Sequence, residues 1–488
     1  MKRTLIILLF LFGTTLQAKT TISGKVQQQD PNLQLKVNVP FDCWYYKELD
    51  REIKINSNGS FSIDIELNEP KSIFFQVNDQ RLLLYAEPGK DIRLDFSPDN
   101  LYKSLVFSGD LAAENRFRKD SGLLIFALDD VSFDFQSAEL KDVVAEMQKA
   151  QQKQLRILEK KKRSFTPKFS KMTKNDLLYF PIYKLLSTII SDSILYRNNK
   201  AEWVEVLIHV NNANPVSNSN AVNSYYYQHL ITYYSRFINL SSANKEILAE
   251  KVEDIMEKPF EEALKEIKAN GERFWEYRVV TSVFRGEVLE MALASMLENA
   301  IRLGELDYLP ETYQGFKERF PQSRYANKIE LLIKPVLERE SGKKISFETE
   351  NNSNDSLSKI LKTHEGRVVL IDLWGTWCPS CRKNFAHIPK LKNELFEMPV
   401  DFVYIAFEYK GENPERLWKR TVNFYNLEGR HILAGNELKS KVPELYGKTG
   451  RFSLPRYLLA DKTGKLKEIN APSPAESGKL IAEIKKLL

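Results

Sequence analysis

The 488-residue sequence is poor in cysteine and, beyond its N-terminus, in long apolar runs. It has three cysteines, and Cys43 is far in sequence from the close pair Cys378 and Cys381. Because a structural zinc site takes about four ligands, this distribution argues against zinc, and we predict neither a metal ion nor a cofactor. No later segment reaches the roughly 18 consecutive apolar residues of a membrane-spanning helix. We therefore expect no transmembrane segment in the mature chain.

Charge of one sign is concentrated only in short runs, such as the basic residues 160–163. The 71 lysines and arginines stand against 65 acidic residues, and the two signs are interleaved along the sequence. Nucleic-acid binding depends on a clustered basic surface, so this pattern gives it no support.

The first 18 residues have the pattern of a secretory signal peptide. Lys2 and Arg3 precede an apolar stretch, and a small residue, Ala18, stands at the expected cleavage position before Lys19. No cysteine follows that could carry a lipid. We expect an exported protein of the periplasm or cell envelope.

The length of the mature chain predicts about three domains. Residues 19–108 alternate short apolar and polar runs with turn residues, which predicts an antiparallel β domain resembling a sandwich. Residues 109–340 carry apolar side chains three and four positions apart, as expected of an all-helical domain. In residues 341–488, strands alternate with helices, which predicts a central sheet covered by helices.

The cysteine pair follows the buried-strand pattern of residues 368–373. Two residues separate Cys378 from Cys381, so both sulfurs are within reach of one disulfide. A thiolate is the attacking species, and Cys378 at a helix N-terminus would face unpaired N–H groups and the positive end of the helix dipole. Cys378 is therefore the predicted nucleophile. Cys381, one turn into the helix, is the predicted resolving thiol, and Pro379 fits the first helical turn.

Two segments carry a family resemblance. Residues 374–381 read Trp-Gly-Thr-Trp-Cys-Pro-Ser-Cys, and residues 453–455 read Ser-Leu-Pro before a strand. With these motifs, residues 343–488 resemble the thioredoxin superfamily, most closely its secreted TlpA-like thiol-disulfide oxidoreductases. The N-terminal β domain resembles, more weakly, extensions of unknown role found ahead of such modules.

The resemblance implies roles for several residues. Pro455 would be a cis-proline beside Cys378, and the backbone of Leu454 would pair with an extended substrate. Trp377 and Pro379 would contact substrate as well. Asp372, six residues before Cys378, would be a buried carboxylate that helps to move a proton from Cys381.

These patterns predict a periplasmic enzyme that exchanges disulfides with envelope proteins, with reduction favoured over oxidation. The family implies a membrane electron donor of the reductase type. Asn384 stands where many TlpA-like proteins have an acidic residue, and this difference leaves the redox potential open. Two alternatives remain: a purely structural disulfide, or a scaffold protein whose β and helical domains recognise an envelope partner. Cys43 is expected to be a buried free thiol in a strand.

Overall fold

The described part of the chain falls into two compact units. The computed structural model describes residues 18–27, 32–123, 133–135, 139–242, 244–337, 344–349, 356–408, 414–447 and 452–488. The predicted signal peptide, apart from Ala18, and the domain boundary at 340 lie outside these ranges. One unit comprises Met1–Leu248 and Val283–Val288, and the other comprises Ala249–Ser282 and Leu289–Leu488. Three separate domains with the boundaries given above remain a prediction.

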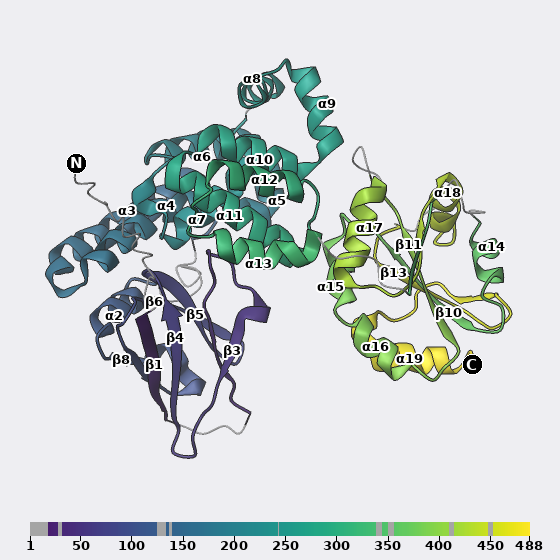
Figure 1. The fold of residues 1–488 in the computed structure, drawn as a ribbon. Helices are drawn as coiled ribbons and strands as arrows, with labels where there is room; N and C mark the ends of the chain where they lie inside the picture. The colour runs from purple at the N-terminus through teal and green to yellow at the C-terminus, as the bar shows by residue number, and fades with distance from the viewer. Residues whose placement is uncertain are drawn as a thin grey trace, which may run out of the picture. The chain divides into compact units, whose positions relative to one another are not determined.

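A β sandwich opens the first unit (Figure 1). One four-stranded sheet has the order β4 (Ser60–Leu67), β1 (Ala18–Val26), β7 (Ile92–Phe96), β8 (Val106–Ser108). The other has the order β3 (Asp50–Ile53), β2 (Leu35–Asn38), β5 (Lys71–Val77), β6 (Gln80–Ala86). Phe75 of the second sheet contacts Phe61 and Phe96 of the first, with ring centroids 5.8 and 6.1 Å apart. The inner faces of the two sheets therefore share one core.

The predicted β domain is confirmed, with one correction to its antiparallel character. The pair β1 and β7 is parallel, because the chain leaves the first sheet after β4 and returns only after building β5 and β6 of the second. Cys43 is buried, as expected, but it lies in the loop after β2 and not in a strand.

Helices make up the described residues between the sandwich and the last unit's sheet, which confirms the predicted helical region. They are α2 (Ala112–Asp120), α3 (Leu140–Lys161), α4 (Pro167–Ser191), α5 (Ser193–Asn198), α6 (Lys200–Asn212), α7 (Tyr225–Leu240), α8 (Lys245–Met256), α9 (Phe260–Asn270), α10 (Glu272–Val283), α11 (Gly286–Leu303), α12 (Leu309–Arg319) and α13 (Ala326–Leu337), while the short α1 (Leu101–Ser104) lies within the sandwich between β7 and β8. Thr166 caps α4 by accepting a hydrogen bond from the Phe169 N–H. None of the described helices is both long and apolar enough to cross a bilayer.

A buried ion pair joins the sandwich to the helices of the first unit. Arg118 of α2 donates to Asp176 of α4 across 3.0 Å, and both side chains are almost fully buried. Arg118 also donates to the Leu83 carbonyl in β6, while Asp176 accepts from Ser224 Oγ and the Tyr225 N–H. Neither charge is left unpaired, which burial in a low dielectric requires.

The C-terminal sheet has the strand order β14 (Leu466–Glu468), β13 (Arg456–Ala460), β10 (Val368–Trp374), β11 (Val400–Ala406), β12 (Gly429–Leu433), β9 (Ile345–Glu348). β10 pairs in parallel with β11 and antiparallel with β13, and β13 and β14 form an antiparallel hairpin. Its helices are α14 (Leu357–Lys362), α15 (Pro379–Phe385), α16 (Ile388–Glu394), α17 (Pro414–Tyr425), α18 (Asn436–Glu444) and α19 (Ser477–Lys485).

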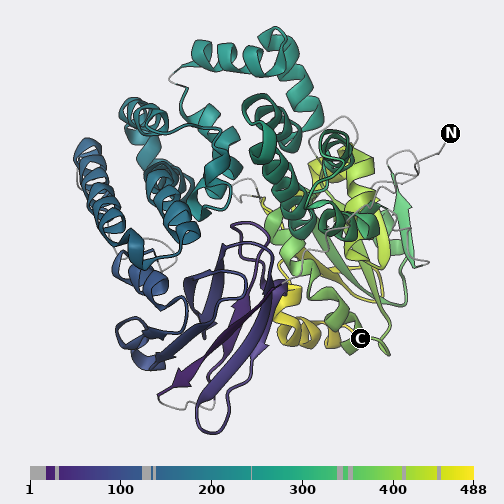
Figure 2. The ribbon, with the colours of Figure 1, turned by 60° about the vertical axis from the view of Figure 1, so that its left-hand side comes forward.

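Helices cover both faces of this sheet (Figures 1 and 2). Every residue of β10 is buried, so its side chains alternate between two apolar layers. Val369, Ile371 and Leu373 pack in the layer with α14 and α18. Val368 and Leu370 pack with α16 and α19, and Trp374 packs with α15 and α17. Asp372 has the same parity as this second group, so it faces the side of the sheet that carries the cysteines.

Candidate functional site

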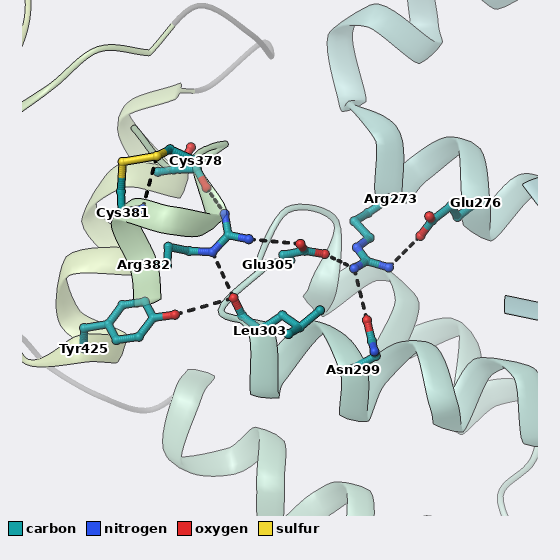
Figure 3. Close-up of polar contacts among 10 residues, drawn as sticks. Arg273, Glu276, Asn299, Leu303, Glu305, Cys378, Cys381, Arg382 and Tyr425 are labelled. Carbon is teal, nitrogen blue, oxygen red and sulfur yellow. Dashed lines mark hydrogen bonds and ion pairs between the residues drawn. A yellow bond between two sulfur atoms is a disulfide. The ribbon is translucent and has the colours of Figure 1, made fainter. Parts of the chain in front are cut away.

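The central strand delivers both cysteines to the start of a helix. β10 ends at Trp374, and Cys378 is the N-cap of α15 with extended backbone angles (φ −99°, ψ 100°). Cys378 and Cys381 form a disulfide, with Cα atoms 5.3 Å apart (Figure 3). The structure is therefore that of the oxidised protein.

The two cysteines are buried to a similar degree, but exposed residues surround only Cys378 in the sequence. Cys378 is 3% exposed and Cys381 is fully buried. Around Cys378 the surface is open, because Trp377 is 44% exposed and Pro379 and Ser380 are exposed as well. The Cys381 N–H donates a hydrogen bond of 3.2 Å to Cys378 Sγ. The same N–H is placed to stabilise a thiolate on Cys378 once the disulfide is reduced.

Asp372 is a buried carboxyl group within the central strand. Its register partners are Tyr404 in β11 and Tyr457 in β13. Among the residues that the structure describes, neither carboxylate oxygen has a hydrogen-bond partner. Burial raises the pKa of Asp372 well above its ordinary value. A group of this kind binds and releases protons at a higher pH than a surface aspartate.

Asn384 contacts a strand neighbour of this carboxyl group. Its side-chain amide donates to the Tyr457 hydroxyl across 3.0 Å, and that tyrosine is the antiparallel neighbour of Asp372. Burial, aided by the charge of Asp372, raises the pKa of Tyr457. Asn384 thus places a neutral hydrogen-bond donor beside the tyrosine that neighbours Asp372.

The proline loop also reaches the dithiol. The Leu454–Pro455 peptide bond is cis, as the resemblance implies. Leu454 packs against the apolar cluster that contains both cysteines and Trp374. The indole N–H of Trp377 donates to the Phe407 carbonyl across 2.8 Å, which fixes the exposed ring at the edge of the site.

Thr376, Glu408 and Arg382 form a hydrogen-bonded group beside the cysteines that the sequence did not predict. Glu408, just after β11, accepts two hydrogen bonds of 2.6 Å from Thr376, one from its N–H and one from its hydroxyl. Burial raises the pKa of Glu408, although the bonds from Thr376 oppose this. On the other side, Arg382 donates to the Thr376 carbonyl. Hydrogen bonds to Glu408 and Arg382 therefore fix the backbone of Thr376, two residues before Cys378.

Only one of these contacts left any trace in the sequence. Arg382 follows Cys381 directly in the sequence, which places a cation near the dithiol. Glu408 is 32 residues from Thr376. Thr376 follows β10 and Glu408 follows β11, and the sequence alone does not indicate that these two strands lie side by side.

Comparison with known proteins defines the class of this domain. Residues 340–485 match the family model described as Redoxin. Together with the strand order and the dithiol, this match makes the C-terminal region a thioredoxin-superfamily domain of the TlpA-like kind.

The individual relatives point the same way. The chain is 30% identical over 91 residues to the thiol-disulfide oxidoreductase ResA of Halalkalibacterium halodurans, which covers 19% of this chain and 48% of that protein. ResA of Bacillus thuringiensis is 28% identical over 108 residues, covering 22% and 57% respectively. The chain thus spans about half the length of these curated relatives.

Solved structures resemble about a quarter of this chain. The thioredoxin domain of a thiol-disulfide oxidoreductase from Bacteroides vulgatus is 18% identical, with a TM-score of 0.21 and coverage of 25% of this chain and 81% of that one. The exposed lipoprotein thioredoxin Etrx1 of Streptococcus pneumoniae is 23% identical, with a TM-score of 0.22 and coverage of 26% and 90%.

Proposed function

We propose that this protein is a thiol–disulfide oxidoreductase of the cell envelope that reduces disulfides in other proteins through Cys378 and Cys381. One observation supports the proposal above all. The two cysteines lie at the start of α15, where the Cys381 N–H donates to Cys378 Sγ. This arrangement stabilises a thiolate on the leading sulfur, which is the species that attacks disulfides.

The reaction has two exchange steps. The Cys378 thiolate attacks one sulfur of the substrate disulfide, so a mixed disulfide forms and the other substrate sulfur leaves as a thiolate. Cys381 then loses its proton and attacks Cys378 Sγ, which closes the intramolecular disulfide and releases the second substrate thiolate. Two electrons pass from the dithiol to the substrate.

Asp372 is the proposed acceptor for the proton of Cys381. It faces the side of the sheet on which α15 packs, and its pKa is raised by burial. A carboxylate with a raised pKa is a stronger base than an ordinary aspartate, which suits the deprotonation of a thiol near neutral pH.

The proposed substrate surface surrounds the leading cysteine. Trp377 and Pro379 are exposed next to Cys378, and Leu454 and Pro455 are partly exposed on the facing loop. An extended peptide laid along this loop would pair with the Leu454 backbone and pack against the Trp377 ring.

Turnover requires a source of electrons. The oxidised pair described here must be reduced again before the next cycle, and an oxidising compartment does not do this. We propose a membrane-bound thiol reductant as the donor. The location in the envelope is supported by the composition of residues 1–18, and cell fractionation with antibody detection tests it.

Reduction of insulin by the purified mature chain tests the activity. Wild type should turn over with dithiothreitol as electron source, and Cys378→Ser should not. Cys43→Ser is the matched control, because Cys43 is a buried free thiol outside the site. Cys381→Ser should accumulate mixed disulfides with its substrates. An inactive wild type, or a Cys378→Ser variant as active as wild type, would leave the disulfide with a structural role only.

A further inference from the structure

Arg382 connects the redox site to the helical part of the same unit (Figure 3). Its guanidinium donates to the Thr376 carbonyl in the active-site loop. It also donates to the Leu303 carbonyl across 2.9 Å and forms an ion pair of 2.9 Å with Glu305. With 6% of its surface exposed, Arg382 is shielded from solvent, so these partners govern its charge and position.

Residues 303–308, here called the α11–α12 loop, are held in place by further contacts. The Tyr425 hydroxyl donates to the Leu303 carbonyl across 3.5 Å, and Arg420 donates to the Leu306 carbonyl across 3.1 Å. Gly304 has a positive φ of 65°, and a Cβ there would lie 2.2 Å from the Tyr425 oxygen. The close approach of this loop to α17 therefore requires glycine.

The charges along this contact alternate. Glu305 lies between Arg382 and Arg273, and it forms an ion pair with each. Arg273 in turn contacts Glu276 across 2.6 Å and Asn299 across 3.3 Å. Glu305 thus offsets the positive charge that Arg382 brings beside the active-site loop, and Arg273 offsets part of the charge on Glu305.

We propose that the α11–α12 loop is a working part of the redox site, in which Glu305 sets the reactivity of Cys378 through the positioning residue Arg382. This inference rests on the proposed thiol–disulfide exchange. Two hydrogen bonds link Arg382 to the region of Cys378. The guanidinium of Arg382 donates to the Thr376 carbonyl, and the backbone N–H of Arg382 donates to the Cys378 carbonyl across 3.2 Å.

The sign of the effect follows from the charges. A cation next to the active-site loop favours the Cys378 thiolate, and Glu305 weakens that influence. Neutralising Glu305 should therefore lower the pKa of Cys378 and stabilise the reduced form, which makes the couple more oxidising. Neutralising Arg382 should do the opposite.

The experiment compares E305Q and R382Q with E311Q in the full mature chain. Glu311 pairs with Arg416 across 3.3 Å, so E311Q breaks an ion pair between α12 and α17 without touching Arg382. The pH dependence of iodoacetamide alkylation at Cys378 and the equilibrium with glutathione provide the two readouts. Circular dichroism establishes that each variant is folded.

We expect E305Q to raise the thiolate fraction at pH 6 about threefold, equivalent to half a pKa unit. The reduction potential should rise by about 15 mV, since a tenfold change in the equilibrium corresponds to about 30 mV. R382Q should shift both quantities in the other direction, and E311Q should leave both unchanged. Opposite shifts separate an electrostatic role from simple loss of packing, which would move both variants in the same direction.

The outcomes distinguish this inference from the proposed function. Should wild type reduce insulin while E305Q and R382Q both retain its potential and alkylation profile, the role of the loop is refuted and the enzymatic assignment stands. Should wild type fail to reduce insulin, the assignment itself fails. If either variant does not fold, E305A and R382M, which remove the same charges, serve in its place, and their shifts should have the same opposite signs.

Discussion

Replacing Asp372 by asparagine should stabilise the C-terminal domain, and the gain should grow with pH. The raised pKa means that folding keeps a proton on this group where the unfolded chain, with a pKa of about 3.9, would release it. The stability that Asp372 contributes is fully present below the unfolded pKa and is lost as the pH rises toward the folded pKa. Asparagine has no proton to lose, so its contribution does not change.

The pH dependence of the free energy of unfolding follows from the binding of one proton to Asp372. Between the unfolded and folded pKa values, wild type should lose about 1.4 kcal/mol relative to Asp372→Asn for each pH unit. Hydrogen exchange of the β10 amides in the oxidised full-length chain, corrected for intrinsic exchange, reports the opening free energy of this domain. Measurements at pH 5, 5.5 and 6 suffice to give the slope.

Asp401 provides the matched control in the neighbouring strand. Burial opposes ionisation there, but hydrogen bonds from His364 and Arg367 outweigh it and lower the pKa of Asp401. The stability that Asp401 contributes is fully present above its unfolded pKa. The opening free energy of Asp401→Asn should therefore differ from that of wild type by the same amount at every pH from 5 to 6. If the curves for wild type and Asp372→Asn run parallel over this range, Asp372 does not retain a proton on folding. Its proposed part in deprotonating Cys381 would then lose its basis.

Three further predictions concern other parts of the chain. Trp377→Ala should lower kcat/KM for a protein disulfide by roughly tenfold with little change for dithiothreitol, because the ring is exposed and, as proposed, would contact only the larger substrate. Arg118→Met should destabilise the first unit by about 3–5 kcal/mol in thermal unfolding, by leaving Asp176 buried and unpaired, and adding Asp176→Leu should restore most of the loss. In the reduced native protein, iodoacetamide should modify Cys378 much faster than Cys43, since burial raises the pKa of the Cys43 thiol; equal rates would contradict this.

The sequence predicted best where local pattern and packing agree. The apolar run of β10 indicated a strand buried on both faces, and the structure has it at the centre of the sheet. The turn residues Asp461 and Gly464 favour a hairpin between the strands on either side of them, and β13 and β14 pair in this way. Both features depend on residues that are close together in the sequence.

Features that depend on distant residues were missed. β9 joins the sheet by pairing with β12, and its residues alternate apolar and polar side chains over only four positions, the shortest run that indicates a strand. In the sandwich, β5 and β6 are apolar on successive positions, so they lack the alternation that marks a half-exposed strand. Likewise, the contacts of Thr376 with Glu408 and of Arg382 with Glu305 join side chains that only the tertiary fold brings together.

The contacts of Arg382 with the α11–α12 loop affect the choice of protein fragment for experiments. A fragment beginning at residue 341 would follow the apparent boundary of the thioredoxin-like region and would retain both cysteines. It would also discard Glu305 and the Leu303 carbonyl, leaving a guanidinium without two of its partners at the mouth of the dithiol. Potentials and rates measured on such a fragment would describe an altered enzyme, whereas one beginning ahead of α10 would keep the loop and its charges.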